Sequence, residues 1–352
     1  MNYNRPELTE DSSLVKVAAL IIILAGVIYA KSIITPVLLA LFISIICDQP
    51  VTWLENRRIP RWLALIIVIL GMIFLFSGFA FLFGETISSF SANLSQYESQ
   101  LTSISNSFLQ FLKEKGLTIR QDQILNLVQP AKVLAFTANT LNKLVGMVGN
   151  TFLISLIVLF TLMEFRSFSV KAKAVFIGSD RSISYLSTIL QNIRHYLGIK
   201  TLICILTGIL VYIALLIIGV DYPILWALIA ALMNYIPNIG SIIAAVPAVL
   251  FALVQLGLTG AIWTLASFMI VNNVLGNFVE PRIMGKGLGL STLVVFLSLI
   301  FWGFIFGPVG MFLSVPFTMT IKIILEQNEN TKWLAILLGT PDEAKTYLEK
   351  KT

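Results

Sequence analysis

The segment YIPNIGSIIAAVP (235–247) is strongly apolar, and so is FGPVGMFLSVP (306–316), yet proline and glycine interrupt both in nearly the same order. In lipid a backbone cannot leave N–H and C=O groups unpaired, so a helix breaks only inside protein or beside a water-filled cavity. Two such breaks at corresponding positions are typical of a membrane transporter's binding site. We therefore expect two broken helical hairpins, 223–256 and 290–325, that meet around a binding site.

The composition of the whole chain indicates a membrane protein. Of its 352 residues, 57% are hydrophobic and 12% are charged, whereas an ordinary soluble domain has about 25% charged residues. Several apolar runs reach the ~20 residues that a spanning helix needs. The sequence predicts an all-α, polytopic integral membrane protein with about eight transmembrane segments, in the apolar runs 14–30, 32–47, 62–83, 144–165, 196–219, 223–256, 259–279 and 290–325.

Changes in polarity divide the chain into six parts. These are three N-terminal spans (1–83), an extracytoplasmic amphipathic helical insert (84–143), a fourth span (144–165), a cytoplasmic amphipathic segment (166–195), a C-terminal transport half with both hairpins (196–325) and a cytoplasmic tail (326–352).

The insert is polar, but apolar residues recur at spacings of three and four between Ile87 and Phe111. This heptad seam predicts helices that pack along a narrow stripe. Two interpretations remain open: helices that fold back on each other within one chain, or contacts between the subunits of a homo-oligomer.

Basic residues in short loops mark the cytoplasmic side of a membrane protein. Such residues gather in three loops, and placing all three inside predicts that both termini are cytoplasmic. The loops hold Arg57, Arg58 and Arg61; Arg166, Lys171, Lys173, Arg181 and Arg194; and Arg282 and Lys286. The net charge of +6 forms no dense basic face beyond these loops, so we expect the lipid bilayer, and no nucleic acid, as a partner.

Signals for an enzyme are absent from the sequence. The chain has one histidine, two cysteines without metal-ligand spacing, and no phosphate-binding GxxxxGK[ST] loop. We expect neither catalytic residues nor a bound metal or cofactor. Transport would then be driven by an ion gradient, by the gradient of the substrate itself or by a separate subunit. Na⁺ or H⁺ is the candidate coupling ion, and a small polar solute or a monovalent cation is the candidate cargo.

Polar side chains within apolar sequence are the candidate binding residues. Asn273, Asn277 and Glu280 are spaced by four and three, so on an α-helix they share one face. A charge at mid-bilayer costs about 2.5–3.5 kcal/mol on insertion scales, so such groups usually face a bundle interior or a water-filled path. Asn234 and Asn238 flank Pro237 at the first break and can approach that face. Alternatively, the asparagines only hydrogen-bond neighbouring helices, and Glu280 pairs with Arg282.

Backbone groups complete the candidate site. At the two breaks, glycine and proline would interrupt the helices and so leave carbonyl groups and helix ends free to act as ligands. The residues concerned are Gly240, Gly307, Pro308 and Gly310. The linker MGKGLGLS (284–291) offers Gly285, Gly287 and Gly289 as a hinge. A plain glycine-rich loop is the alternative interpretation of the linker.

The order of PxxG (237–240), NNxxGNxxEPRIMGKGLGLS (272–291) and GPxGMFLSVP (307–316) resembles the autoinducer-2 exporter family of bacterial membrane proteins. The resemblance covers roughly residues 10–340. It implies about eight membrane segments in the bacterial cell (inner) membrane and a carrier of small solutes or ions. Members of that family are assigned to export of autoinducer-2 and to Na⁺(Li⁺)/H⁺ antiport.

Three hypotheses for function follow. The first is a secondary transporter of a small polar, autoinducer-2-like solute that works by alternating access. The second is a Na⁺(Li⁺)/H⁺ antiporter with Glu280 as the exchanging carboxylate. The third, of another class, is a membrane scaffold that transports nothing and acts through the heptad helices of 87–111.

Overall fold

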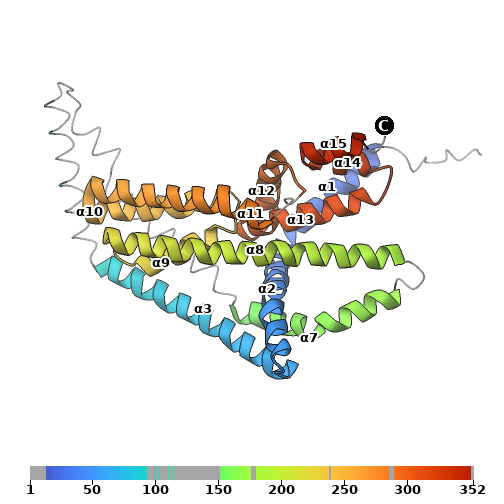
Figure 1. Cartoon of the computed structure of the whole chain (residues 1–352), viewed down its shortest axis with the longest axis horizontal. Helices are drawn as coiled ribbons and strands as arrows, with labels where there is room; N and C mark the ends of the chain where they lie inside the picture. The colour runs from blue at the N-terminus through green and yellow to red at the C-terminus, as the bar shows by residue number, and fades with distance from the viewer. Residues whose placement is uncertain are drawn as a thin grey trace, which may run out of the picture.

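A computed structural model describes residues 13–92, 99, 103, 110, 114, 151–175, 180–237, 239–284 and 289–349. Helices dominate these residues, and no β-strand occurs among them, which confirms the predicted all-α class. Most of the heptad seam and most of the insert lie outside the described residues, and the start of the seam at Ile87 and Phe90 belongs to the helix Arg61–Ala92. The helices are α1 (Ser13–Tyr29), α2 (Lys31–Asn56), α3 (Arg61–Ala92), α7 (Thr151–Val175), α8 (Asp180–Ile218), α9 (Pro223–Met233), α10 (Gly240–Asn272), the π-helix η1 (Asn273–Val279), α11 (Glu280–Met284), α12 (Thr292–Phe306), α13 (Pro308–Glu326), α14 (Lys332–Leu338) and α15 (Pro341–Glu349) (Figure 1).

Helix α8 lies across the middle of the molecule, with α9 and α10 along one end of it (Figure 1). It is a single helix of 39 residues, so the described part of the amphipathic segment that we predict to be cytoplasmic is continuous with the apolar run after it. Helices α2, α9, α10, α11 and α13 all contact it. Residues on α8 are therefore placed to face most of the elements that carry the predicted site.

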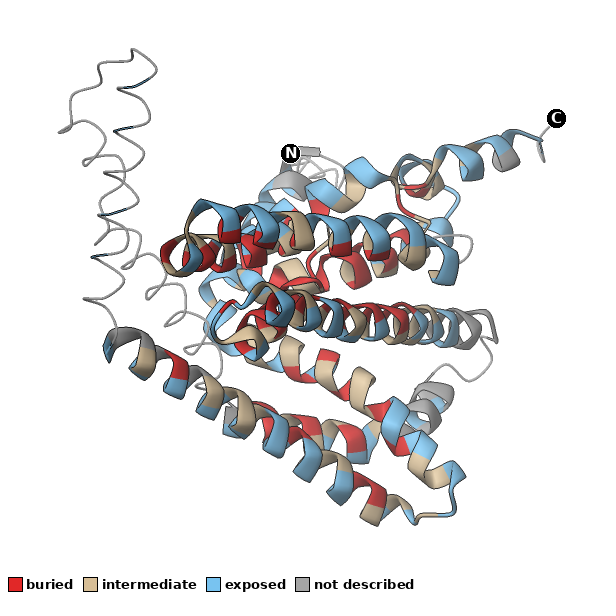
Figure 2. Ribbon diagram, turned by 60° about the vertical axis from the view of Figure 1, so that its left-hand side comes forward, coloured by how far each residue is buried: buried red, intermediate tan, exposed pale blue. Residues whose placement is uncertain are grey.

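The core consists of three apolar clusters. The first joins α8, α9 and α10, the second joins α2, α3 and α7, and the third joins α2, α8, α12 and α13. Figure 2 shows buried residues on the inner sides of these helices and exposed residues on their outer sides. Because α2 and α8 contribute to the third cluster as well as to one other, they connect the N-terminal helices with the C-terminal hairpins.

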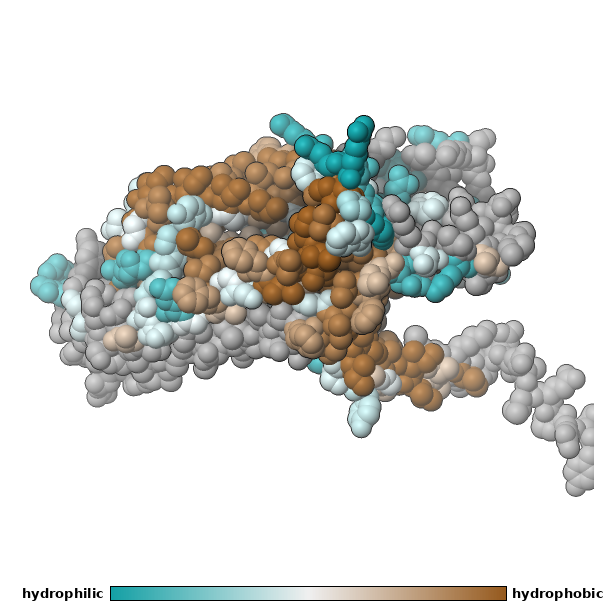
Figure 3. Space-filling model, turned by 90° about the horizontal axis from the view of Figure 1, so that it is seen from below, coloured by the Kyte–Doolittle hydropathy of each residue, from teal (hydrophilic) through white to brown (hydrophobic). Residues whose placement is uncertain are grey.

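Large apolar side chains also cover much of the exterior, on α1, α2, α3, α8, α10 and α12 among others. Figure 3 shows one face on which hydrophobic residues form a broad continuous area. Soluble proteins rarely expose such areas, which mark membrane contact here. Within the described residues, five segments are long and apolar enough to cross a membrane: Lys31–Asn56, Arg61–Thr86, Ser187–Ile218, Gly240–Met284 and Pro308–Glu326. Shorter apolar helices are Phe152–Phe165, Pro223–Met233 and Thr292–Phe306. The chain is thus a multi-pass membrane protein.

The first break follows α9, whose last helical residue is Met233. Pro237 lacks the N–H that would continue the helical hydrogen bonds, and a turn leads to α10 at Gly240. A Cβ atom on Gly240 would lie 1.7 Å from the carbonyl oxygen of Met233. Only glycine allows the second helix to begin so close to the end of the first.

The second break is tighter, since only Gly307 separates α12 from α13. Gly307 takes φ +65°, a conformation that suits glycine, and Pro308 starts the next helix. A Cβ atom on Gly310 would lie 1.9 Å from the carbonyl oxygen of Trp302. Both predicted breaks are therefore present, each with a glycine against the carbonyl group of the preceding helix.

A third interruption lies at Gly257, inside α10. Its φ of +72° separates two helical stretches, and a Cβ atom on Gly260 would lie 2.3 Å from the Cβ atom of Leu256. The sequence GLTG (257–260) thus takes a conformation like that of GPVG (307–310). The first hairpin therefore consists of α9 and the part of α10 before Gly257, and the rest of α10 leads on to η1.

Candidate functional site

One face of α8 carries polar side chains within an otherwise apolar stretch. Lys200, Cys204 and Thr207 follow each other at spacings of four and three, and all three are buried. Buried polar groups in a membrane protein need partners, because lipid offers none. The partners of this face come from the first break and from α11.

Lys200 forms a buried ion pair with Glu280. Its ammonium group donates hydrogen bonds to both carboxylate oxygens, at 2.9 and 3.0 Å. The Lys200 side chain is 4% exposed and that of Glu280 is 19% exposed. At an effective dielectric constant of about 20, two charges this close attract each other by roughly 4 kcal/mol or more. The pair joins α8 to the polar segment after α10, and Arg282, the partner considered from sequence, is exposed.

The π-helix η1 explains why Glu280 faces α8. In a π-helix each turn takes in more residues than in an α-helix. Seven residues of π-helix (Asn273–Val279) therefore rotate Glu280 away from the direction that α-helical spacing predicts. The face that Asn273, Asn277 and Glu280 would share on an α-helix is consequently not formed.

Asn273 and Asn277 lie on the exposed side of η1. The Asn273 side-chain amide donates to the carbonyl group of Met269 at 2.9 Å, and the Asn277 amide donates to the Asn273 side-chain oxygen at 2.8 Å. Their hydrogen bonds thus stay within their own helix, and the structure does not place them beside the Lys200–Glu280 pair.

The first break supplies the other partners of α8. The buried Asn234 side-chain amide donates to the Thr207 hydroxyl at 3.1 Å and approaches the Cys204 sulfur at 3.8 Å. The Tyr235 hydroxyl donates to the Thr201 hydroxyl at 2.8 Å. Pro237 is half-buried, and Asn238 lies outside the described residues.

Aromatic contacts bring the two breaks together. The Tyr235 ring lies edge-on to Phe312 of α13, with ring centroids 6.2 Å apart, and edge-on to Phe42 of α2 at 5.7 Å. Phe312 follows Gly310 by two residues, so the second break begins close to the first. Of the second break, Gly310 is buried, Gly307 is half-buried and Pro308 is exposed. The polar cluster of the site lies on the α8 side of the first break. It consists of Lys200, Thr201, Cys204, Thr207, Asn234, Tyr235 and Glu280.

A cavity of about 880 Å³ separates the N-terminal helices from the first half of α8. Arg194 of α8 pairs with Asp48 of α2 at 2.8 Å, and Arg61 donates to the carbonyl group of Leu162 at 2.8 Å. Both arginines line the cavity, as does Glu164, which pairs with Lys171. Charged and hydroxyl groups thus border a space large enough for a small solute between two parts of the molecule.

Comparison with known proteins adds to this geometry. The family model described as AI-2E family transporter matches residues 17–330. The chain belongs to the AI-2E transporter family. Its relatives include a putative transport protein of Haemophilus influenzae (40% identical, covering 95% of this chain and 97% of the relative) and the putative transport protein YhhT of Escherichia coli K12 (36% identical, 99% of each). A third, AI-2 transport protein TqsA of E. coli K12, is 37% identical over 91% of this chain and 93% of the relative.

Lys200 is the residue of this AI-2E family transporter that sequence reasoning missed. It stands alone in the apolar run IKTLICILTGIL (199–210), where an unpaired cation is costly. Its spacing to Cys204 and Thr207 marks a polar stripe on one helix face. Both signals were present in the sequence, although the identity of its partner depends on the π-helix.

Proposed function

We propose that this AI-2E family transporter is a secondary transporter of a small polar solute and works by alternating access. About eight membrane segments would hold it in the bacterial cell membrane, with both termini in the cytoplasm. The observation that carries the proposal is the buried Lys200–Glu280 pair beside the first helix break.

A buried ion pair can be a strong but reversible connection between two elements. Separating it without compensation costs several kcal/mol, because each charge then lies alone in a medium of low polarity. A polar solute can lower that cost when its hydroxyl or carbonyl groups replace the lost partner. Binding of the solute and movement of α11 relative to α8 would then be coupled through the same two side chains.

The broken helix next to the pair supports a polar cargo. The Asn234 amide and the Thr201 and Thr207 hydroxyls are already buried there, so they offer hydrogen bonds at little further desolvation cost. The relative TqsA is named as an AI-2 transport protein. A small polar, autoinducer-2-like solute is the cargo that we propose to test first.

The test is solute flux into liposomes that contain purified protein. We expect Lys200→Met and Glu280→Gln each to reduce flux at least about tenfold, since each removes one half of the pair. The double variant Lys200→Met with Glu280→Gln leaves no unpaired charge. If the double variant regains wild-type flux, the pair serves the fold alone and the proposal fails. Arg282→Gln, which changes an exposed charge nearby, is the matched control.

Cation/proton antiport is the second candidate, and the partial exposure of the Glu280 carboxylate favours it. An exchanging carboxylate must meet water, and here it must also release Lys200 before a cation binds. In inverted vesicles, antiport requires sodium- or lithium-dependent proton movement that is lost in Glu280→Gln. Solute flux without such proton movement would reject this candidate and leave the first intact.

A further inference from the structure

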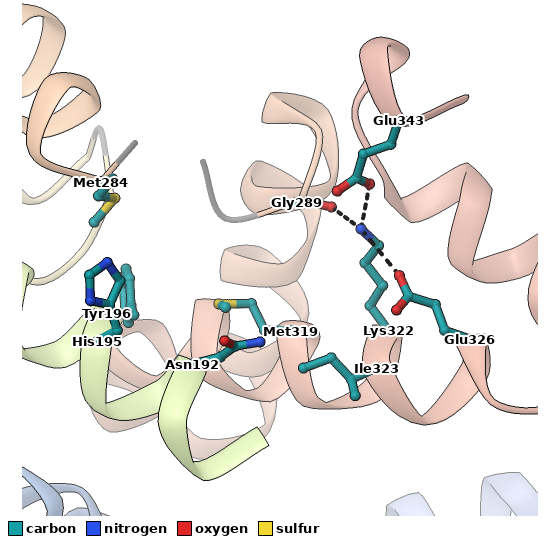
Figure 4. A pocket seen from close by; sticks show the side chains of 10 residues that line it. All are labelled: Asn192, His195, Tyr196, Met284, Gly289, Met319, Lys322, Ile323, Glu326 and Glu343. Carbon is teal, nitrogen blue, oxygen red and sulfur yellow. Dashed lines mark hydrogen bonds and ion pairs between the residues drawn. The ribbon is translucent and has the colours of Figure 1, made fainter. Parts of the chain in front are cut away.

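Lys322 of α13 is a buried lysine whose ammonium group has three oxygen partners. It donates to the carbonyl group of Gly289 at 2.5 Å and to the Glu343 carboxylate at 2.5 Å, and it lies 3.4 Å from the Glu326 carboxylate. Figure 4 shows this arrangement, with Glu343 reaching Lys322 from α15. One side chain thus joins α13, the linker before α12 and the C-terminal tail.

The tail also holds the linker through its backbone. The Ser291 N–H group donates to the carbonyl group of Leu338, at the end of α14, at 3.0 Å. Gly289 takes φ +65°, and a Cβ atom there would lie 2.9 Å from both the Lys322 ammonium and a Glu343 oxygen. Gly339 lies still closer to Glu343, since a Cβ atom there would be 2.6 Å from a carboxylate oxygen. These contacts leave little freedom at the end of the linker.

The linker is the last part of the connection between the two hairpins, after the second stretch of α10, η1 and α11. It leads from α11, which carries Glu280, to α12, the first helix of the second hairpin. Any movement of α12 and α13 relative to α11 must be taken up between Met284 and Thr292. Of the three glycines considered as a hinge, Gly285 and Gly287 lie outside the described residues, whereas Gly289 is in contact with the tail.

We propose that α14 and α15 form a tail clasp, which holds the linker through Lys322 and restrains movement between the two hairpins. Release of Glu343 would free Gly289 and Ser291 together, because both contacts depend on the same docked tail. The effect on transport rests on the function proposed above, whereas the clasp itself does not.

The surroundings of the clasp allow it to open. Glu326 and Glu343 are about half exposed, so water and salt reach the carboxylates while Lys322 stays buried. A cavity of about 250 Å³ adjoins them, lined also by Asn192, His195, Tyr196 and Met319. Opening at Glu343 would therefore move its carboxylate toward water, whereas full release of α14 would also expose Ala335, which is buried, and Leu338, which packs against the third cluster.

Hydrogen exchange of the purified full-length protein tests the clasp directly. In Glu343→Gln, we expect the peptide that contains Ser291 and the peptides of α14 and α15 to exchange about three- to tenfold faster than in the wild type. Glu326→Gln should have a smaller effect, because its contact is longer. Glu329→Gln is the matched control, since it removes a surface ion pair with Lys332 at 3.1 Å and should leave exchange of the linker unchanged.

Unchanged exchange at Ser291 in Glu343→Gln would overturn the clasp, and so would an equal increase in the peptides of α8, which would report general loosening. Solute flux into liposomes that contain the same variants then tests whether the tail clasp restrains transport. Faster flux in Glu343→Gln than in Glu329→Gln supports it, and equal flux with faster exchange rejects it. If no variant and no wild-type protein transports, the proposed function fails while the exchange result still decides the clasp.

Discussion

Gly240 lies so close to Met233 that a single added methyl group would meet the Met233 carbonyl oxygen at 1.7 Å. The backbone would have to shift, because neither group is at the end of a flexible side chain. The Trp302–Gly310 approach at the second break repeats this relationship at 1.9 Å. Close backbone packing, rather than any polar side chain, therefore defines the shape of both breaks.

The first prediction concerns that packing. Gly240→Ala should destabilise the protein by about 1–3 kcal/mol or more, because the helices of the first hairpin must move apart. Gly71→Ala on α3 is the control, since nothing lies within 4 Å of its Cβ position and alanine favours a helix by up to ~1 kcal/mol. Thermal unfolding in detergent measures both. A melting temperature for Gly240→Ala equal to that of the wild type would contradict the described turn.

The second prediction concerns asymmetry in the Lys200–Glu280 pair. Glu280→Gln leaves a cation that is almost fully buried, whereas Lys200→Met leaves a carboxylate that is 19% exposed and reaches water more easily. We expect Glu280→Gln to be the more destabilising change, at about 3–5 kcal/mol. Unfolding of both single variants and the double variant gives the coupling free energy. The reverse order of stabilities would show that Lys200 has another partner in solution.

The third prediction separates the two roles of Tyr235. Tyr235→Phe removes the hydrogen bond to Thr201 and keeps the ring contacts, so it should cost only about 0.5–1.5 kcal/mol. Tyr235→Ala also removes the contacts with Phe42 and Phe312, and a cost of about 3–5 kcal/mol is expected. Thermal unfolding of the two variants provides the comparison. Equal losses would mean that the rings contribute little to the contact between the breaks.

The fourth prediction concerns water in the cavity between α2, α7 and α8. Thr161 lines that cavity, whereas Val158, one turn earlier on α7, is fully buried. In a background with Cys47→Ala and Cys204→Ala, Thr161→Cys should react with a small charged thiol reagent at least about tenfold faster than Val158→Cys, because the reagent needs water. Mass spectrometry after labelling measures the reaction rates of the two cysteine variants. Similar slow labelling of both would indicate a closed, dry space.

Sequence reasoning located both helix breaks because proline and glycine act locally. Pro237 and Pro308 cannot continue a helix, and Gly240 and Gly310 allow what no other residue allows at such close approach. The turn at Gly257 carries a weaker signal, since GLTG has no proline and lies within apolar sequence. Its local conformation depends on packing between the two stretches of α10, which a single sequence does not display.

The polar contacts were harder to predict than the breaks. The sequence shows the polar stripe of Asn273, Asn277 and Glu280, but α-helical spacing predicts the wrong direction for Glu280. The π-helix from Asn273 to Val279 is stabilised by tertiary contacts, including the burial of Leu275. No local pattern in the sequence predicts this π-helix. Lys200 lies 80 residues before Glu280, and such a distant pairing becomes visible only in three dimensions.

The length of η1 has a consequence for variants that change the number of residues. Because η1 already takes in about one residue more than an α-helix would, deleting one residue between Asn273 and Val279 would favour regular α-helical winding and leave the following residues facing as they do now. Inserting one residue there would instead turn the following residues by about 100° around the helix axis. Glu280 would then point away from Lys200, and Lys200 would lose its counter-charge although every functional side chain remained in the protein. Chain length at this point is thus as necessary for charge balance in the bundle as the identity of the acid.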